Sequence, residues 1–473
     1  TGDGTYWEYH RASFFGRANY SYASKYLFQA TVRADGSSKF GQNNHWGVFP
    51  SVALGWRINE ENFFPKNSAV SNLKLRASWG RLGNEDALGY YDYNPVMSSS
   101  NTQWLSYVQG GNPWLGYMNL YLLNNDLRWE TTDTKNVGID YGFFNNKLSG
   151  SINYYYNTTT DLLIEKVIAP SAGVYNSIVN VGKMRNTGVE FDINWSDNYR
   201  GFEYNIGFNL TTTSNKMLKA DDNQVLYGTG LKYGTEHFPT QTLKGNPVAS
   251  FFLYRTDGIF QTQEEADSYL DKNGNKMQPD AFAGDIKFKD VNGDGVLDEN
   301  DKEYCGSGIP KVEANLSFGG SYKGIDLSFL IGSAWGNKLY NANRYNYEAM
   351  NSGSNFLKSA LDAWTPEHRN TNVPRAVMDD FNGNSRESDR FLEDGDFIRL
   401  RQLQIGYTLP AKWMKKVYVD RCRFYVSGEN LLTWTKYSGV DPEFSRSNIL
   451  DTGVDSFIYP FTRSYVVGVQ VTF

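Results

Sequence analysis

The chain has 473 residues, of which 16% are aromatic and 45 are Gly, and its formal net charge is −6. An acidic balance argues against a nucleic-acid binder, which would carry a basic patch or stripe. Aromatic and Gly enrichment without a collagen repeat indicates strands joined by tight turns.

Hydropathy and cysteine content further limit the kinds of protein that this chain can be. The mean hydropathy is −0.54, and no apolar run approaches the roughly 18 residues that a membrane-spanning helix needs. A membrane-spanning strand needs only about 10 residues of alternating pattern and has a polar lumen face, so a membrane β-barrel is hydrophilic on average. Cys305 and Cys422 are too few for a disulfide framework and form no zinc pattern, so we interpret them as incidental or at most as one bridge.

Apolar and polar side chains alternate along many short segments; Phe28 and Ala30, for example, oppose Gln29. This period of two predicts strands with one face in an apolar medium and the other in a wetter one. About 13 or 14 strands fit the pattern. They lie near residues 12–22, 26–35, 46–57, 73–79, 137–143, 151–156, 189–195, 204–210, 312–318, 325–331, 403–409, 424–428 and 463–473.

The predicted strands are joined by connections of two kinds. Short polar turns, rich in the Asn, Gly and Asp that tolerate positive φ, occupy 145–147, 196–201 and 323–324. Long connections cover about 83–130, 215–310, 336–395 and 437–460. Short turns at one rim and long loops at the other are typical of an outer-membrane barrel. The alternative, a soluble sandwich, rarely carries so many long irregular loops.

Both faces of the predicted sheet favour a barrel. Aromatic side chains lie near the ends of the apolar band, as interfacial girdles do, although core packing is the alternative for each one: Trp56, Trp79, Phe143, Trp195 and Tyr407. Charged side chains occupy the opposite face: Arg33, Asp35, Lys74, Arg76, Asp140, Glu190 and Asp192. Such charges would be costly in a sandwich core without partners and are ordinary beside a wet lumen or a polar plug.

A calcium-type loop is predicted within the long connection of 215–310, over residues 285–301. Its six candidate ligands, of which Val296 gives a carbonyl, are Asp290, Asn292, Asp294, Val296, Asp298 and Asp301. Gly295 stands at the sharp turn of the template, but position 12 is Asp rather than Glu, and no helical pattern flanks the loop, so it is not an EF-hand proper. We expect a structural Ca²⁺ that staples an exposed loop; the alternative is a polar turn that never holds a metal.

The last segment, Arg463 to Phe473, alternates strictly. One face carries Tyr465, Val467, Val469, Val471 and Phe473, and on the other face only Val466 is a large apolar residue. A chain end in a sheet usually frays unless something pairs with it. A strand that ends on an aromatic residue therefore suits the closing strand of a membrane barrel, although the last strand of a soluble sandwich would look similar in isolation.

Several motifs, in order along most of the chain, resemble one family. They are Gly284 to Asp290 running into the calcium-type loop, Asn180 to Glu190, Leu392 to Arg401 continuing to Pro410, and Gly428 to Leu432 followed by Gly439 to Glu443. Together they resemble the SusC/RagA family of TonB-dependent outer-membrane transporters of Bacteroidetes.

The resemblance implies a fold and a set of partners. The expected fold is all-β, an antiparallel transmembrane β-barrel with long extracellular loops and short periplasmic turns. The implied partners are a SusD-like surface lipoprotein that caps the barrel as a lid, TonB acting through an N-terminal plug, the lipid bilayer of the outer membrane and the substrate. A dimer of transporter–lipoprotein pairs is compatible with this arrangement.

The chain departs from the full family pattern at its start. Thr1 to Gly4 has the composition of a loop, with no signal peptide, and we find no TonB box, plug or early strands. Residues 1–473 are therefore expected to be the C-terminal portion, about 14 of about 22 strands. Because open edges are not tolerated in lipid, a missing N-terminal part is expected to complete the barrel.

The implied activity is active import of oligomeric nutrients, with oligosaccharides favoured over oligopeptides. Aromatic rings on loops stack on sugar faces and also grip peptide side chains. The candidate contacts are Trp104, Tyr107, Trp114, Tyr117, Tyr121, Trp335 and Tyr340, with Tyr345 and Tyr347 nearby. Packing within the loops and contact with the lid are the alternatives for each ring.

Catalysis finds little support, and we predict that the chain is not an enzyme. The four His residues are scattered, no nucleophile elbow occurs and no hydrolase His pair occurs. Acidic residues could form a glycosidase pair, but a sequence cannot place two carboxylates across a sugar. The other functions left open are a siderophore or cofactor receptor, an outer-membrane barrel enzyme and a structural or adhesive surface protein.

Overall fold

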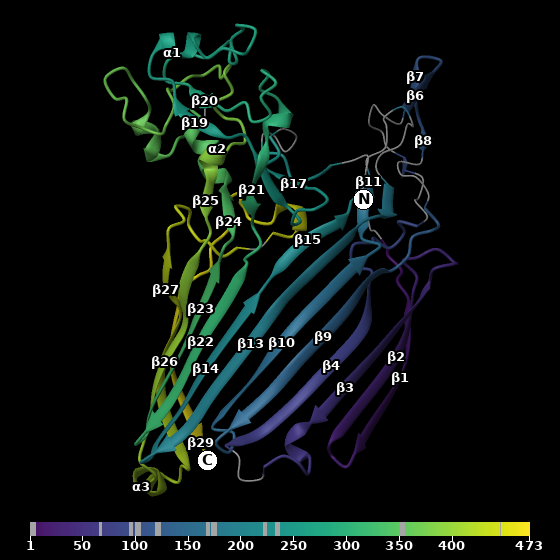
Figure 1. Ribbon diagram of the computed structural model, residues 1–473, viewed down its shortest axis with the longest axis vertical. Helices are drawn as coiled ribbons and strands as arrows, with labels where there is room; N and C mark the ends of the chain where they lie inside the picture. The colour runs from purple at the N-terminus through teal and green to yellow at the C-terminus, as the bar shows by residue number, and fades with distance from the viewer. Residues whose placement is uncertain are drawn as a thin grey trace. The chain divides into compact units, whose positions relative to one another are not determined.

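The computed structural model consists mainly of antiparallel strands (Figure 1). The chain divides into two compact units: a first unit of residues 1–195 and 214–225, and a second unit of residues 196–213 and 226–473. The structure describes residues 6–65, 69–93, 98–99, 106–118, 124–166, 171, 177–220, 225–231, 237–350, 355–444 and 446–473.

The sheet of the first unit follows the order of the chain. Neighbouring strands pair antiparallel, and the short strand β15 (Ser214–Lys219) returns to pair with the beginning of β13. The long strands are β1 (Arg11–Tyr22), β2 (Tyr26–Ser37), β3 (Trp46–Arg57), β4 (Val70–Asn84), β9 (Glu130–Phe143), β10 (Leu148–Thr160) and β13 (Lys183–Tyr199), which carries the chain into the second unit.

The sheet of the second unit is built in the same way. Each strand again pairs antiparallel with the next one in the chain. The strands are β14 (Phe202–Thr212), β22 (Val312–Tyr322), β23 (Ile325–Trp335), β26 (Phe397–Thr408), β27 (Arg421–Thr435) and β29 (Ser464–Thr472). The segments of alternating sequence thus coincide with strands, and the predicted all-β antiparallel fold is confirmed.

The strand register separates the predicted apolar and polar faces. On the apolar face of the first unit, Ile139 lies opposite Leu75 and Ile152. On the polar face, Arg76 donates to Asp140 Oδ1 at 2.9 Å and to Asn153 Oδ1 at 2.5 Å. Lys74 Nζ lies 3.3 Å from Asp140 Oδ2. Lys74, Arg76 and Asp140 on the polar face are therefore paired across strands, whereas Ile152 on the apolar face is 44% exposed.

Tight turns join the strands at one end of each sheet. Arg200 and Gly201 have φ of 52° and 83°, and Lys323 and Gly324 have φ of 49° and 88°. Two successive positive φ values fit a two-residue hairpin whose twist matches that of the strands. The connection between β26 and β27 at this end contains α3 (Ala411–Met414) and the 3₁₀ turn η6 (Lys415–Val417).

The long connections of the second unit fold together at the opposite end of its strands, and we call the described residues of 226–311, 336–396 and 436–463 the loop assembly (Figure 1). Its β-strands are β16 (Leu226–Tyr227), β17 (Thr240–Thr242), β18 (Ser250–Leu253), β19 (Thr256–Ile259), β20 (Ile286–Phe288), β21 (Glu303–Ser307), β24 (Lys338–Asn341), β25 (Leu392–Asp394) and β28 (Val454–Asp455). Its helical segments are α1 (Gln263–Asp267), α2 (Ala342–Glu348), η3 (Glu299–Asp301), η4 (Lys358–Asp362), η5 (Asp389–Phe391) and η7 (Ile449–Asp451).

Two hydrophobic clusters give the loop assembly a core of its own. Phe251, Tyr340 and Phe391 belong to one cluster, and Phe288 and Trp364 belong to the other. The strand β24 pairs with β25, from the same long connection, and with β28, so two long connections share one small sheet. These connections therefore pack together as one folded layer and are not separate irregular loops.

The long connections of the first unit also contain short elements. They are η1 (Ile58–Glu60), β5 (Ser98–Ser99), β6 (Ser106–Gln109), β7 (Asn112–Leu115), β8 (Tyr117–Met118), β11 (Leu163–Lys166) and β12 (Ser177–Asn180). Phe40, Phe49 and Trp129 form a buried cluster at the loop end of this sheet. No helix in the described part of the chain is long and apolar enough to cross a membrane.

Candidate functional site

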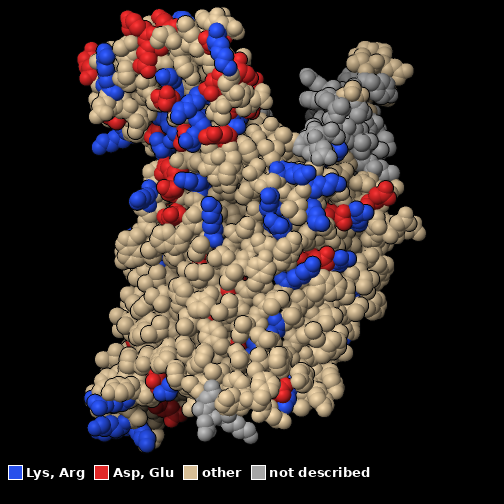
Figure 2. All heavy atoms as spheres, in the orientation of Figure 1, with Lys and Arg blue, Asp and Glu red and all other residues tan. Residues whose placement is uncertain are grey.

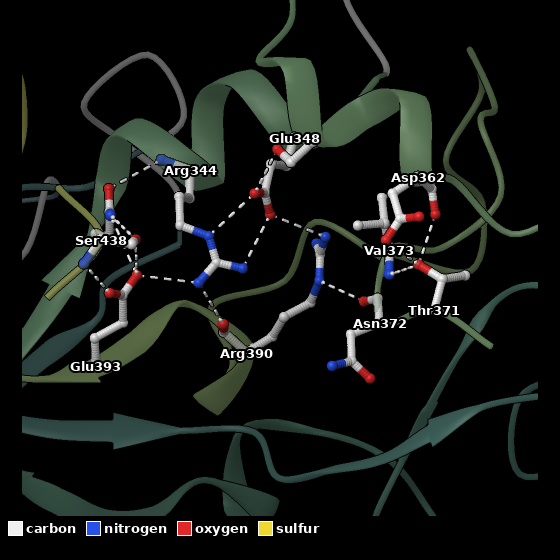
Figure 3. Close-up of polar contacts among 11 residues, drawn as sticks. Arg344, Glu348, Asp362, Thr371, Asn372, Val373, Arg390, Glu393 and Ser438 are labelled. Atoms are coloured by element: carbon white, nitrogen blue, oxygen red, sulfur yellow. Dashed lines mark hydrogen bonds and ion pairs between the residues drawn. The ribbon is translucent and has the colours of Figure 1, made fainter. Parts of the chain in front are cut away.

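A buried group of charged side chains ties the loop assembly together around α2 (Figure 3). Arg344 donates to both carboxylate oxygens of Glu348, at 3.1 Å each, and to Glu393 Oε1 at 3.1 Å. Arg390 donates to Glu348 Oε2 at 3.1 Å and to the Asn372 carbonyl at 3.3 Å. Glu348 thus accepts from two guanidinium groups that lie on different segments.

The pKa values of this group follow from burial and from the neighbouring charges. Burial alone would raise the pKa of the Glu348 carboxyl, but the guanidinium groups of Arg344 and Arg390 lower it below its ordinary value. Burial lowers the pKa of Arg390 to about 10. At neutral pH both partners are therefore charged, and each depends on the other because a lone buried charge is costly.

Glu393 extends the same network to the last long connection. Its carboxylate accepts from the Ser438 backbone N–H and from the Ser438 hydroxyl at 2.7 Å each (Figure 3). Asn341 Nδ2 also donates to it, at 3.2 Å. These contacts join β24, β25 and the connection that follows β27.

A second buried cluster centres on Glu387, which is 3% exposed. His237 Nδ1 lies 2.6 Å from Glu387 Oε2, and the Lys302 ammonium forms an ion pair with Oε1. Burial would raise the pKa of Glu387, but His237 and Lys302 together lower it below its ordinary value. The cluster joins the segments before β17, after η3 and before η5.

A third cluster surrounds Asp285, which is completely buried. Arg375 donates to its two oxygens at 2.7 and 3.2 Å, and Asn384 Nδ2 donates to Oδ1 at 2.8 Å. Where the assembly meets the strands, Arg399 on β26 forms ion pairs with Asp441 and Glu443. In all of these clusters the charges neutralise one another. Such an arrangement is suited to fixing the segments of the loop assembly to one another rather than to general acid–base chemistry.

The calcium-type loop forms a compact turn in the loop assembly. Asp290 accepts backbone N–H groups from Gly293 at 2.6 Å and from Gly295 at 2.9 Å. The buried Asp301 accepts from Val291 and Asp298 at 2.8 and 2.9 Å. These bonds hold the carboxylates of two predicted ligands, Asp290 and Asp301, in fixed positions around one turn. Among the described residues, no three His, Cys, Asp or Glu side chains are grouped so that they could hold a metal ion.

The predicted aromatic contacts are distributed over both units. Trp104 and Tyr121 lie outside the described residues, and Tyr107 and Tyr117 lie on β6 and β8. Trp114 on β7 is 53% exposed, and its indole N–H donates to the Gln109 carbonyl at 3.3 Å. In the second unit, Trp335 at the end of β23 is partly exposed.

The prediction that Tyr340 contacts substrate is wrong for this structure. Its side chain is fully buried in a hydrophobic cluster, with the Phe251 and Phe391 ring centroids at 6.3 and 6.0 Å. Tyr345 belongs to the same cluster and is also buried. These rings fill the core of the loop assembly, which was the alternative role considered for them.

The sequence did not reveal the buried ionic clusters or the exposed apolar side chains of the loop assembly. The spacing of Arg344 and Glu348 on α2 was a usable signal, because residues four apart share one face of a helix. The contact between Glu348 and Arg390 crosses 42 residues and had no local signal. Four large apolar side chains that point into solvent were also missed: Phe282, Leu361, Met378 and Phe381.

Comparison with known proteins identifies the family. Residues 1–431 match the family model described as "TonB dependent receptor-like, beta-barrel". The chain is 33% identical to TonB-dependent receptor P3 of Formosa agariphila, over 98% of this chain and 45% of the relative. It is 30% identical to TonB-dependent receptor SusC of Bacteroides thetaiotaomicron, over 98% of this chain and 43% of the relative.

Similarity to solved structures supports the same family. The RagAB peptide transporter aligns with 27% identity and a TM-score of 0.77, over 98% of this chain and 48% of the matched chain. The 'closed-closed' state of the RagAB peptide importer gives 26% identity and a TM-score of 0.79. The chain thus spans about half the length of the relatives that it matches. These relatives are named as receptors and transporters rather than enzymes, as the sequence predicts, and the chain belongs to the TonB-dependent receptor-like β-barrel family, as its resemblance to SusC and RagA indicates.

Proposed function

We propose that this chain forms the wall and the outer loops of a TonB-dependent importer that carries oligomeric nutrients across the bacterial outer membrane. The observation that carries the proposal is the likeness to RagAB over 98% of the chain. The exposed apolar face of the strands supports a position in lipid, and the loop assembly supports a position on the outer side. A plug and its coupling to TonB belong, in this proposal, to the rest of the full-length protein.

The substrate is proposed to be an oligomer, with an oligosaccharide as the first candidate and an oligopeptide as the second. Exposed Trp114 and Trp335 could stack on the faces of sugar rings. The specific observation in favour of a peptide is the similarity to RagAB, which is described as a peptide importer. A siderophore or cofactor receptor is the alternative within transport.

A SusD-like lipoprotein is proposed to cover the loop assembly as a lid. Leu361, Met378 and Phe381 are 85%, 68% and 77% exposed. Large apolar side chains exposed on a folded surface mark sites where another protein binds. The buried ionic clusters of the loop assembly would keep this surface in one shape while the lid moves.

A structural Ca²⁺ is proposed for the loop of residues 290–301. Asp290, Asn292, Asp294, Asp298 and Asp301 would provide side-chain oxygens, and Val296 would provide its carbonyl. A bound Ca²⁺ would supply positive charge to a turn rich in carboxylates and would stabilise the fold of that turn within the loop assembly.

The proposal is tested by uptake in the native bacterium. A strain that lacks the receptor is expected to lose growth on one class of oligomer and to regain it with the intact gene, but not when TonB is absent. Labelled oligosaccharides and oligopeptides, tested separately, decide between the two substrates. Loss of iron or cofactor uptake, with normal use of both oligomers, would favour a siderophore-type receptor instead.

A further inference from the structure

The apolar face of the first unit ends in a cluster of cations at the loop ends of its strands. Strand register places Lys135 beside Trp79 and Tyr156 in one row of this face. The next row toward the loops contains Arg81, Asp133 and Arg185. We call the cations of these rows and their neighbours the basic cluster: Arg81, Lys135, Lys183, Arg185, Lys216 and Lys219.

The rows on the other side of the basic cluster are apolar. Val137 lies between Ala77 and Tyr154, and the following row contains Leu75, Ile139 and Ile152. In Figure 2, Lys and Arg side chains gather over the loop ends of these strands, and the surface closer to the hairpin turns is largely uncharged. The cations therefore begin where the apolar band ends.

The basic cluster is not neutralised within the described chain. Arg81 pairs with Asp133 at 2.9 Å. Within the described residues, the other five cations form no ion pair with a carboxylate, and the buried Nε of Arg185 has no hydrogen-bond partner. On the polar face, by contrast, Lys74 and Arg76 share Asp140. Among the described residues, five of the six cations of the basic cluster thus lack a carboxylate partner of the kind that Lys74 and Arg76 have.

A tyrosine marks the boundary between the two zones. The Lys135 ammonium and the Arg185 guanidinium each lie 5.8 Å from the centre of the Tyr156 ring. Tyr and Trp, represented in this row by Tyr156 and Trp79, favour the level where hydrocarbon meets headgroups, because one end of the ring system is apolar and the other is polar. Arg185 lies four residues beyond Val189 on β13, or about 13 Å along the strand.

We propose that the basic cluster binds the phosphate groups of anionic lipids in the leaflet on the loop side of the membrane. This inference rests on the proposed position of the apolar face in lipid. If lipid tails cover the apolar rows, they end at the level of the basic cluster. The phosphate groups of a lipid lie directly beyond the end of its hydrocarbon tails, and therefore beside these cations. Guanidinium and ammonium groups pair well with phosphate, Arg as a planar fork and Lys as a point charge.

The test uses the intact receptor, purified from outer membranes in mild detergent, and native mass spectrometry with diphosphorylated lipid A. The variant Lys183→Ala/Arg185→Ala/Lys216→Ala removes three cations of the cluster. We expect about fivefold weaker lipid binding for each cation removed. The matched control, Lys412→Ala/Lys415→Ala/Lys416→Ala, removes three exposed lysines at the hairpin end of β26 and is expected to bind lipid A as the wild type does.

A second measurement needs no variant. Wild-type receptor is expected to retain diphosphorylated lipid A and to lose most of this binding with dephosphorylated lipid A or phosphatidylcholine. Equal retention of all three lipids, or of lipid A by both triple variants, would overturn the proposal. If the cluster variant lost the lipoprotein or a second receptor copy and kept lipid A, the cluster would be a protein interface instead. A receptor absent from the membrane would contradict the proposed function itself.

Discussion

Glu348 lies in the interior of the loop assembly and links two of its segments. It accepts from Arg344 and Arg390, and its side chain is almost completely buried. Glu348→Gln would leave the buried Arg390 guanidinium without its carboxylate, which costs about 3 to 5 kcal/mol, while Arg344 would keep its ion pair with Glu393. We expect faster hydrogen exchange in α2 and β25. Glu367→Gln, on an exposed side chain of the same assembly, should leave exchange unchanged, and equal protection in both variants would contradict this role.

Glu387 makes the loop assembly sensitive to acid. Because its pKa is below its ordinary value in the folded chain, the folded form binds fewer protons and is stabilised when the carboxylate is ionised. That stabilisation is complete above the ordinary pKa of about 4.3 and is lost as the pH falls further.

The acid sensitivity is measured by limited proteolysis between His237 and Glu387 over a series of pH values. Cleavage in the wild type is expected to rise below about pH 4.3. Glu387→Gln should be cleaved more at neutral pH, because it leaves the buried Lys302 with only the exposed carboxylate of Glu299, and its cleavage should depend less on pH. A wild-type profile that stays flat below this pH would disprove the coupling.

At the scale of single elements, the period of two was sufficient to predict the strands. Alternation in residues 137–143 and 151–156 depends only on which face each side chain takes, and this is a local property of an extended chain. β13 begins at Lys183, before the alternating apolar segment, because its backbone already pairs with β10 there, although most of these first residues are polar or charged. A hydrophobic pattern cannot reveal such an extension.

The loop assembly could not be predicted in the same way. Tyr340 and Trp335 look alike in sequence as aromatic loop residues, yet one is buried in a core and the other is partly exposed. The difference depends on Phe251, which reaches Tyr340 from another long connection, and on Phe391, which lies 51 residues further along the same connection. Burial and ion pairing between distant segments are not encoded in a local pattern. The sequence therefore identifies aromatic residues that are candidates for substrate contact, but it does not show which distant side chains pack against them.

Strand β29 provides a direct test of whether the apolar face lies in lipid. Val467 lies on the apolar face and is 81% exposed, whereas Gln470 lies on the other face. An aspartate in hydrocarbon costs about 2.5 to 3.5 kcal/mol. Val467→Asp is therefore expected to reduce the amount of heat-modifiable barrel in the outer membrane, and Gln470→Asp is not. Equal amounts of both variants would mean that the apolar face is not in lipid.

The calcium-type loop is tested as an element by removing two of its carboxylates. Asp290→Ala/Asp294→Ala is expected to abolish bound calcium, measured by elemental mass spectrometry of the purified receptor, and to increase protease cleavage near residues 285–305. Asp267→Ala/Asp271→Ala, which removes the same charge outside the loop, should retain the metal. Calcium content that is unchanged, or absent from the wild type, would end the calcium proposal.

At the scale of the whole molecule, the chain provides two surfaces with different chemistry. The strands present an apolar face bordered by cations, and the loop assembly combines exposed apolar side chains with buried paired charges. Together these surfaces suit a protein that is held in a membrane and covered by a partner. Binding of the proposed anionic lipid and of the proposed lipoprotein can therefore be measured on one preparation of the receptor.

Native mass spectrometry of the receptor, extracted gently from outer membranes, decides whether the chain works within a lid-covered importer. We expect a SusD-like lipoprotein to co-purify, with an oligosaccharide or peptide mass bound to the complex. Leu361→Asp/Phe381→Asp should release the lipoprotein, whereas Leu361→Met/Phe381→Leu should retain it. A barrel that carries neither lipoprotein nor oligomer in the wild type would contradict the proposed function.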